Sequence, residues 1–336
     1  MSRPADVFDR LADRQSFRRR LNRWFASYGR DLPWRRTRDP YAILVSEFML
    51  QQTQVAAVIP YYQRWLERFP DFAVLARARE SEVLHAWQGL GYYARARHLH
   101  AAANVVRQKF YGEIPPDAAT IAQLPGVGRY TAGAVASFAF ELPEPMVDTN
   151  IARVLARLTN YNQPIDSSAG RDHLWAAAAA LVPKIGSRKH NSALMELGAL
   201  VCLPRRPRCT QCPVRQFCRA PAPALLPVRR RKPATIHLTE PHTFRRGRDR
   251  ILLERSSSRW RGMWILPRLS RVPERTAPLL QLDFPFTHHR VTLVVFASSA
   301  VELPNERQKW FPIGALPHLP LATPHRRALA QLLARN

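Results

Sequence analysis

Apolar residues recur every three to four positions through most of residues 7–220, the spacing that places them on one face of an α-helix. Three alanine-rich segments show this spacing clearly: 131–140, 151–159 and 173–182. Asp39 followed by Pro40 is a typical N-cap and first-turn pair, and we expect the helix that they open to run through Gln54. The pattern therefore predicts a first region that is largely α-helical.

The pattern changes after the last cysteine of the chain. Residues 220–235 are rich in proline and then in arginine, which is typical of an extended linker. Beyond them, 250–254 and 291–296 have the character of strands, and 324–335 has the character of an amphipathic helix. We therefore expect an all-α domain over 1–219, the linker, and a smaller α+β domain over 236–336.

The charge of the chain bears on its partners. The 336 residues include 51 basic and 25 acidic ones, and the net charge of +26 is shared equally between residues 1–225 and 226–336. Nucleic acid is the first candidate partner, and an arginine-biased genome is the alternative, because only five of the basic residues are lysines. No apolar run approaches the ~20 residues that span a bilayer, so no membrane partner is expected.

All the cysteines of the chain fall in one window with the spacing C-x6-C-x2-C-x5-C: Cys202, Cys209, Cys212 and Cys218. Residues 1–20 are charged and lack the apolar core of a signal peptide, so we expect a reducing cytoplasm, where clustered cysteines usually bind metal rather than form disulfides. The spacing alone leaves zinc open. Arg205, Arg206 and Arg208 lie between the first two cysteines, which suggests that this loop contacts a polyanion.

A pair of glycines marks a second motif. Gly126 and Gly128 flank one valine in the sequence Leu-Pro-Gly-Val-Gly-Arg-Tyr. Glycine permits a tight turn, and the N–H groups in the first turn of the following helix stay open to bind a phosphate. With the small-residue helix that follows, the motif predicts a helix-hairpin-helix, which grips the DNA backbone without reading its sequence.

Two carboxylates are candidates for acid–base chemistry. Glu47 lies in the otherwise apolar run Val-Ser-Glu-Phe-Met-Leu, and burial there would raise its pKa and make it a general acid near neutral pH. Periodicity alone favours a solvent-facing Glu47. Asp148 begins a predicted helix, and taken alone it is an N-cap.

Together these motifs resemble the endonuclease III superfamily of helix-hairpin-helix DNA glycosylases. Over residues 20–218 their order is that of the family: the glutamate helix, Gly-Leu-Gly-Tyr-Tyr-Ala-Arg-Ala-Arg from residue 89, the hairpin, the aspartate and the four cysteines. The resemblance implies a [4Fe–4S] cluster as cofactor. Strand-cleaving members carry a nucleophilic lysine where this chain has Tyr130, so the resemblance implies base excision by water without lyase activity.

Within that superfamily the chain is similar to the adenine glycosylases of the MutY type. It shares their Leu-Pro-Trp from residue 32 and their Ser-Glu-x-Met-Leu-Gln-Gln-Thr from residue 46, and residues 236–336 resemble their Nudix-like domain, which recognises 8-oxoguanine. The resemblance to the Nudix-like domain rests on the sequence Trp-Arg-Gly-Met-Trp-Ile-Leu-Pro, which begins at residue 260. The resemblance implies a monomer, associated with the bacterial nucleoid, that excises adenine opposite 8-oxoguanine or guanine in double-stranded DNA during base excision repair.

The resemblance also implies catalytic roles. Glu47 would protonate the adenine ring at N7 after the base is flipped out of the duplex. Asp148 would stabilise the oxocarbenium-like sugar, the logic of two carboxylates in glycoside hydrolysis. Asn150 and Tyr130 would orient the acid groups and the bound sugar.

Binding roles follow in the same way. Trp34, Arg35 and Leu50 would line the base pocket. Contacts with DNA are expected from Gln51, Gln52, Thr53, Tyr92, Gly126, Gly128, Arg205, Arg206 and Arg208. Among these, Gln52 and Tyr92 would wedge into the base stack and Thr53 would touch 8-oxoguanine. Phe286, Thr287 and His288 would form the lesion-sensing loop.

The chain departs from the family at three positions. Thr149 follows Asp148 where glycine is common, Ser192 replaces a glutamine or glutamate that reads the adenine amino group, and Thr287 replaces a serine. A G:T mismatch thymine glycosylase is the main alternative, although such enzymes generally lack the C-terminal domain. A catalytically idle DNA-binding or redox-signalling protein is the second, and the presence of both Glu47 and Asp148 argues against it.

Overall fold

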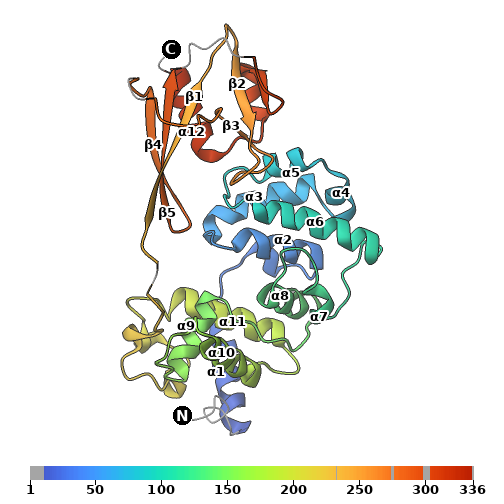
Figure 1. Cartoon of the computed structure of the whole chain (residues 1–336). Coiled ribbons are helices and arrows are strands. Elements are labelled where there is room, and N and C mark those ends of the chain that lie inside the picture. Colours follow the sequence, from blue (N-terminus) through green and yellow to red (C-terminus); the bar gives the residue numbers. More distant parts are fainter. Residues whose placement is uncertain (1–10, 232, 274–275, 298–302, 335–336) are drawn as a thin grey trace. The chain divides into compact units, whose positions relative to one another are not determined.

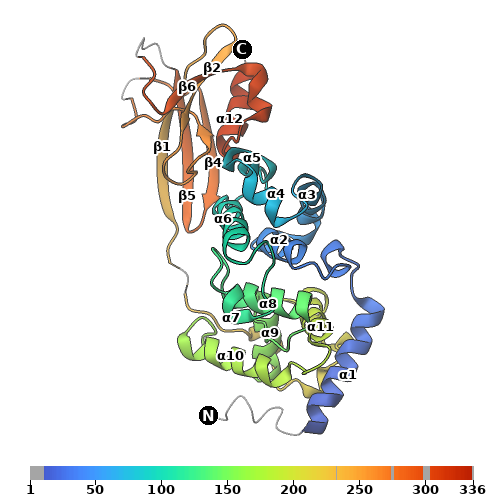
Figure 2. The same cartoon turned by 90° about the vertical axis from the view of Figure 1, so that its right-hand side faces the viewer.

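The computed structural model describes residues 11–231, 233–273, 276–297 and 303–334. The chain divides into two compact units, Met1–Glu67 with Ala102–Arg231 and Arg68–Ala101 with Lys232–Asn336. The elements of each unit can be followed by their labels in Figure 1 and, turned by 90°, in Figure 2.

The first unit is built mainly of helices. They are α1 (Leu11–Tyr28), α2 (Pro40–Leu50), α3 (Val55–Arg68), α7 (Ala118–Ile121), α8 (Arg129–Phe140), α9 (Thr149–Leu158), α10 (Ser168–Leu181) and α11 (Ser187–Leu200), and α6 (Ala94–Lys109) crosses the boundary between the units. The prediction of a largely helical first region is therefore confirmed, with the alanine-rich segments in α8, α9 and α10. Among the helices that the structure describes, none is both long and apolar enough to cross a membrane.

One apolar core joins helices α1, α8, α9, α10 and α11. Phe17 of α1, Leu155 of α9 and Leu194 of α11 are almost completely buried in it. Small residues let the backbones approach closely, since a Cβ on Gly133 of α8 would lie only 2.7 Å from the Pro145 carbonyl oxygen. The close packing of α8 fixes where its first turn lies, and that turn carries part of the site described below.

Helix α2 begins as predicted and ends earlier. The Asp39 side chain accepts hydrogen bonds from the N–H groups of Tyr41 and Ala42, at 3.0 and 3.3 Å. The expectation that this helix runs through Gln54 is wrong, because it ends at Leu50. Gln51 has an extended ψ of 114° and Gln52 a left-handed φ of 56°, and neither conformation continues an α-helix.

The segment predicted as a linker lies partly against the first unit. The Arg157 Nε donates to the Leu226 carbonyl oxygen at 3.0 Å, and the Ile165 N–H donates to the Val228 carbonyl oxygen at 3.1 Å. Further along, the Arg230 N–H reaches the Asp166 carboxylate at 3.1 Å. Residues up to 231 therefore belong to the first unit, held by backbone hydrogen bonds that their composition does not reveal.

The second unit combines short helices with two small sheets. Its elements are α4 (Phe72–Arg77), α5 (Glu80–Ala86), β1 (Ile236–Phe244), β2 (Arg250–Arg255), β3 (Trp264–Ile265), β4 (Leu280–Phe286), β5 (His289–Ala297), β6 (Gln308–Pro312) and α12 (Thr323–Ala334). One sheet has the order β1-β5-β4, with β1 parallel to β5, and the other has the order β3-β2-β6 and is antiparallel. Helix α12 packs along β4 (Figure 2).

The predicted strands and the final helix are confirmed. The segments 250–254 and 291–296 lie in β2 and β5, and α12 covers the predicted helix up to Ala334, while residue 335 lies outside the described residues. Alternate residues of β2 and β5, among them Ile251, Leu253 and Leu293, point into one apolar core together with Leu329 of α12.

A pair of histidines lies in the interior of the second unit. His242 of β1 and His325 of α12 are fully buried, with ring centroids 4.7 Å apart. The Nδ1 atom of His242 lies 2.7 Å from the Leu266 carbonyl oxygen, and the Nδ1 atom of His325 accepts from the Leu266 N–H at 3.2 Å. Burial lowers the pKa of His242 to about 4 and that of His325 well below its usual value, and the neighbouring Arg268 lowers both further.

This pair predicts a pH-dependent stability. The unfolded chain binds a proton at His242 below about pH 6.5, whereas the folded chain resists protonation down to about pH 4, so the free energy of unfolding should fall as pH falls through this window. For His242 alone the loss between pH 7.5 and 5 is roughly 2 kcal/mol. Urea unfolding of the full chain at both pH values, compared with His242→Asn, would measure it. An equal pH dependence in the two proteins would contradict this account.

Candidate active site

A cavity of about 790 Å³ opens in the first unit where α2 ends and α8 and α9 begin. The predicted residues that line it are Trp34, Arg35, Glu47, Leu50, Gln51, Gln52, Thr53, Tyr130, Asp148 and Asn150. They come from segments about a hundred residues apart in the sequence. The break after Leu50, which ends α2 early, is what turns Gln51 to Thr53 toward this cavity.

Glu47 is buried in the wall of the cavity. Only 3% of its surface is exposed, so the solvent-facing orientation that periodicity favours is wrong. Burial raises the pKa of its carboxyl to about 7; a hydrogen bond with Tyr130 lowers the pKa in part, and the charge of Asp148 raises it. Periodicity failed here because α2 is buried on nearly every face, with Tyr41 to Met49 all inside the protein.

The Asp148 carboxylate both caps a helix and faces the cavity. Its Oδ1 accepts from the N–H of Ile151 at 2.6 Å and caps α9, as its sequence position predicts. Its Oδ2 accepts from the Asn150 side-chain amide at 3.2 Å, and the carboxylate also lines the cavity. Desolvation raises the pKa of Asp148, while the hydrogen bonds from Ile151 and Asn150 oppose that rise.

Tyr130, in the first turn of α8, connects the cavity wall to Glu47. Burial, together with the nearby charges of Glu47 and Asp148, raises its pKa well above its usual value. The phenol therefore stays protonated at any physiological pH and donates its hydrogen bond to the Glu47 carboxyl. Two carboxyls and one phenol thus face a common space.

A buried arginine fixes the Asn150 amide. Arg153 Nη2 donates to the Asn150 Oδ1 at 2.8 Å and to the Gly198 carbonyl oxygen at 2.7 Å, and its Nε donates to the Cys202 carbonyl oxygen at 2.7 Å. With its oxygen engaged by Arg153, Asn150 presents its NH2 group to Asp148. A Cβ at Gly198 would lie 2.7 Å from the Asn150 Cβ, so no side chain fits there.

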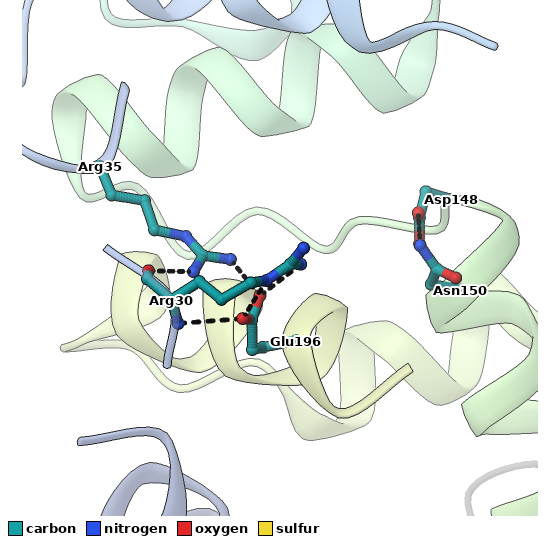
Figure 3. Close-up of polar contacts among 5 residues, drawn as sticks. All are labelled: Arg30, Arg35, Asp148, Asn150 and Glu196. Atoms are coloured by element: carbon teal, nitrogen blue, oxygen red, sulfur yellow. Dashed lines mark hydrogen bonds and ion pairs between the residues drawn. The ribbon is translucent and has the colours of Figure 1, made fainter. Parts of the chain in front are cut away.

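A second buried carboxylate, Glu196 of α11, closes another part of the cavity wall. Arg30 donates to it from Nε (2.6 Å), from Nη2 (3.0 Å) and from its backbone N–H (3.0 Å), and Arg35 Nη2 donates at 2.8 Å. Figure 3 shows both guanidinium groups converging on Glu196, whereas Asp148 and Asn150 lie apart and are paired with each other. Because the Glu196 side chain is wholly buried and fully bonded, it holds both arginines in the cavity wall.

Sequence reasoning found Arg35 but missed Arg30, Arg153 and Glu196. Glu196 stands in the apolar run Ala-Leu-Met-Glu-Leu-Gly-Ala-Leu, the same signal of an acidic residue among apolar ones that drew attention to Glu47. The local sequence does not distinguish Arg30 and Arg153 from the many other arginines of the chain.

A narrower cavity of about 30 Å³ adjoins the first. Trp34, Arg35, Glu47 and Leu50 line it together with Ser192 of α11. Ser192, one of the departures noted in the sequence, thus lies beside the general-acid candidate and leaves room for about one water molecule. Thr149, another departure, lines the larger cavity and is exposed.

The two hairpin glycines lie in the turn between α7 and α8. Gly126 has a left-handed φ of 75°, and Gly128 is the N-cap of α8 and has no side chain with which to cap it. Gly128 lines a separate groove of about 350 Å³ with Arg129 and Trp175. The Arg129 guanidinium lies over the Trp175 ring, 3.9 Å from its centroid.

The four cysteines line one cavity of about 210 Å³, and all four are free thiols. Cys202, Cys212 and Cys218 pack on the apolar core of the first unit. Arg157 is buried beside them and donates to the Cys202 Sγ at 3.2 Å. Burial raises the pKa of Cys212 to about 11. Within the described ranges, no three His, Cys, Asp or Glu side chains are grouped so that they could hold a metal ion.

The remaining predicted residues are distributed between the two units. Arg205, Arg206 and Arg208 lie on the cysteine loop of the first unit, and all three are exposed. Tyr92, Phe286, Thr287 and His288 belong to the second unit. Thr287 follows the last residue of β4 with a left-handed φ of 55°, which is unusual for a β-branched residue, and its hydroxyl donates to the Phe286 carbonyl oxygen at 2.7 Å.

Two helices, α7 and α8, joined by a turn that contains Gly126 and Gly128 are the motif of helix-hairpin-helix proteins. The model of the HhH-GPD superfamily of base excision DNA repair proteins matches residues 45–178. Among solved structures, a thermostable thymine-DNA glycosylase is 32% identical with a TM-score of 0.57, and the match covers 62% of this chain and 96% of that one. The chain belongs to the HhH-GPD superfamily.

Several relatives of this chain are adenine DNA glycosylases. That of Rattus norvegicus is 47% identical over 226 residues, which is 65% of this chain and 44% of the rat protein. That of Mycolicibacterium smegmatis is 45% identical over 192 residues, which is 57% of this chain and 65% of the relative. The chain thus spans less than half the length of the rat relative that it matches. A trapped endonuclease III–DNA intermediate, 24% identical with a TM-score of 0.54 over 65% of this chain and 97% of that one, shares the fold.

The geometry predicts opposite effects of two substitutions on Glu47. Tyr130→Phe removes a hydrogen bond that lowers the pKa of Glu47, so the pKa should rise. Asp148→Asn removes a negative charge that raises it, so the pKa should fall. Both can be followed from the carboxyl carbon resonance of ¹³C-labelled glutamate during a pH titration, with Tyr28→Phe as an exposed control. Shifts in the same direction would show that the three groups do not interact as described.

Proposed function

We propose that this protein is a monofunctional DNA glycosylase that excises adenine paired with 8-oxoguanine or guanine in double-stranded DNA. The observation that carries the proposal is the meeting of Glu47, with a pKa of about 7, and Asp148 in one cavity of a base excision repair fold. The name shared by relatives that are 41–47% identical supports adenine as the base.

The proposed reaction begins with adenine flipped out of the base stack, since its glycosidic bond cannot be reached within the duplex. Protonated Glu47 donates its proton to N7 of the ring. The bond between N9 and C1′ then breaks, and its electron pair stays with the leaving adenine. The positive charge that develops on the sugar is stabilised by Asp148, which the Asn150 amide holds in place.

Water completes the reaction. The Glu47 carboxylate, now deprotonated, accepts a proton from a water molecule as the hydroxide adds to C1′, which regenerates the acid and leaves an abasic site. Tyr130 keeps the Glu47 carboxyl oriented through both steps but offers no amine. None of the described residues that line the cavity is a lysine, so these residues supply no amine for Schiff-base formation and strand cleavage.

A thymine glycosylase acting on G:T mispairs is the second candidate. The solved thymine-DNA glycosylase, 32% identical over 62% of this chain, supports it. Ser192 also favours it in part, because the small hydroxyl beside Glu47 cannot reach the edge of a base as a longer amide would. The names of the curated relatives favour adenine.

We further propose that the second unit senses 8-oxoguanine through a Nudix-like domain. Phe286, Thr287 and His288 form the tip between β4 and β5, where Thr287 has a left-handed φ of 55°. Gln51, Gln52 and Thr53, at the rim of the cavity, would contact the strand opposite the adenine, and Gly126 and Gly128 the phosphates. The monomer is the proposed active form.

We propose that the four cysteines hold a [4Fe–4S] cluster, as the resemblance of their spacing implies. All four line one cavity of about 210 Å³, and four thiolates are the ligand set of such a cluster. The cluster would supply a structural clasp for the loop that carries Arg205, Arg206 and Arg208. Arg157 would stay beside it, as it already donates to the Cys202 Sγ and to the carbonyl oxygens of Leu203 and Pro204.

Three duplexes test the proposed activity. They carry adenine opposite 8-oxoguanine, thymine opposite guanine, and an oxidised pyrimidine, and half of each reaction is treated with alkali. We expect cleavage of the adenine strand only after alkali, at a rate that falls above about pH 7 as Glu47 loses its proton. An intact adenine strand would refute the proposal. Cleavage at thymine alone would establish the second candidate, and nicking without alkali would contradict the monofunctional mechanism.

Replacement of Glu47 tests the assignment of the acid. Glu47→Gln should lower the single-turnover rate of adenine excision by roughly 10²- to 10⁴-fold, because it removes the proton donor, and should leave duplex affinity unchanged. Glu67→Gln, on the exposed face of α3, is the matched control and should excise normally. Excision by Glu47→Gln at the rate of the control would rule out this role.

Metal analysis tests the cofactor. The purified protein should contain about four iron and four sulfide per chain, with broad visible absorption. Cys212→Ser should lose that absorption and lower duplex affinity, with a shallower dependence on salt as the arginine loop is released. One zinc per chain, with no visible absorption, would instead establish a zinc site.

A further inference from the structure

Tyr92 is presented in an uncommon conformation. Its φ is +46°, in the left-handed region that bulky residues rarely occupy, and 45% of its surface is exposed. It follows Gly91, whose φ is +71°, and its carbonyl oxygen accepts from the N–H of Arg95 at 2.9 Å as α6 begins. An exposed aromatic side chain held in such a backbone requires support from its surroundings.

The Arg95 side chain supplies that support. The side chain is buried, with the residue only 6% exposed, and its Nη2 donates to the carbonyl oxygens of Leu90 and Gly91 at 3.0 and 3.2 Å. These are the two carbonyls directly before Tyr92. The indole N–H of Trp87 also donates to the Gly91 oxygen, at 3.1 Å. The turn is therefore fixed by three side-chain donor contacts to its backbone.

The same guanidinium lies between two aromatic rings. Its central carbon is 5.3 Å from the centroid of the Trp87 ring and 5.7 Å from that of Tyr92. Trp87 is wholly buried, so its ring is a fixed contact surface for the guanidinium. Cation–π contacts of this kind strengthen when they are desolvated. Burial lowers the pKa of Arg95 to about 10, which leaves it charged at neutral pH.

We propose that Arg95 is a positioning residue that fixes the Tyr92 ring as a preformed wedge for the DNA base stack. The inference rests on the proposed function, in which Tyr92 enters the stack when the base is flipped. A wedge that is ordered before binding loses less conformational entropy on insertion than a mobile one. Arginine suits this task because its guanidinium donates to two carbonyl oxygens while its central carbon lies over two aromatic rings, whereas the lysine ammonium is a point charge that does not stack on rings.

The test compares Arg95→Lys, Tyr92→Ala and the double variant in the full chain. Single-turnover excision of adenine opposite 8-oxoguanine is one readout. The other is the fluorescence of 2-aminopurine at the adenine position, measured in a Glu47→Gln background so that the base is flipped without excision. Arg107→Lys, exposed on the same helix α6, is the control and should behave as the parent.

Arg95→Lys should lower both signals roughly tenfold, the scale of a lost desolvated cation–π contact and hydrogen bond. The double variant should be no worse than Tyr92→Ala, because without the ring there is nothing left to position. Gly91→Ala, which strains the same turn and meets no neighbouring atom, should reproduce the loss even if Arg95→Lys folds poorly. Parental signals in Arg95→Lys, or losses that multiply in the double variant, would overturn the inference.

The two proposals fail in different ways. If the parent protein excises no adenine, the proposed function is wrong. The fluorescence of the 2-aminopurine duplex then still reports whether Arg95 governs insertion of Tyr92. If the parent excises adenine and Arg95→Lys matches it in both readouts, only the role of Arg95 is wrong.

Discussion

The removal of the Glu47 carboxyl from water is the condition on which the candidate site depends. The carboxyl lies inside α2, a helix that is apolar on nearly every side, and α8 packs against it through small residues. A charged carboxylate there loses hydration, so its pKa rises to about 7 and the neutral acid is populated at physiological pH. The hydrogen bond from Tyr130 limits the rise, and the charge of Asp148 adds to it. The same burial that stabilises the helical core therefore prepares the acid.

The first turn of α9 connects the other half of the site to the rest of the unit. Asp148 caps this helix while facing the cavity, and Asn150 holds the second oxygen of its carboxylate. Arg153, one turn on, fixes Asn150 and also the carbonyl oxygen of Cys202. The N-terminus of α9 thus holds Asp148 in place and also presents it to the cavity. The arginine that orients the Asn150 amide also bonds to the cysteine loop.

Buried arginines recur throughout both units, and they change the meaning of the net charge. Arg95, Arg153 and Arg157 are each at most 6% exposed, and each donates to a backbone carbonyl oxygen in a turn or loop that carries functional candidates. Arg30 and Arg35 share the buried carboxylate of Glu196. Some of the arginines that contribute to the net charge of +26 are therefore buried and structural, and only the remaining ones are available to bind a polyanion.

The sequence by itself determined what local patterns encode: the helical first region, the strands β2 and β5, the cap at Asp39, the hairpin glycines and the compact cysteine set. Periodicity could not determine that Glu47 is buried, because both faces of α2 are covered by partners distant in the chain. Local patterns also missed the end of α2 at Leu50 and the roles of Glu196 and Arg153, which are set by contacts made only when separate segments pack. Residue types and spacing specify the groups available for chemistry, whereas their burial and pairing arise from tertiary packing.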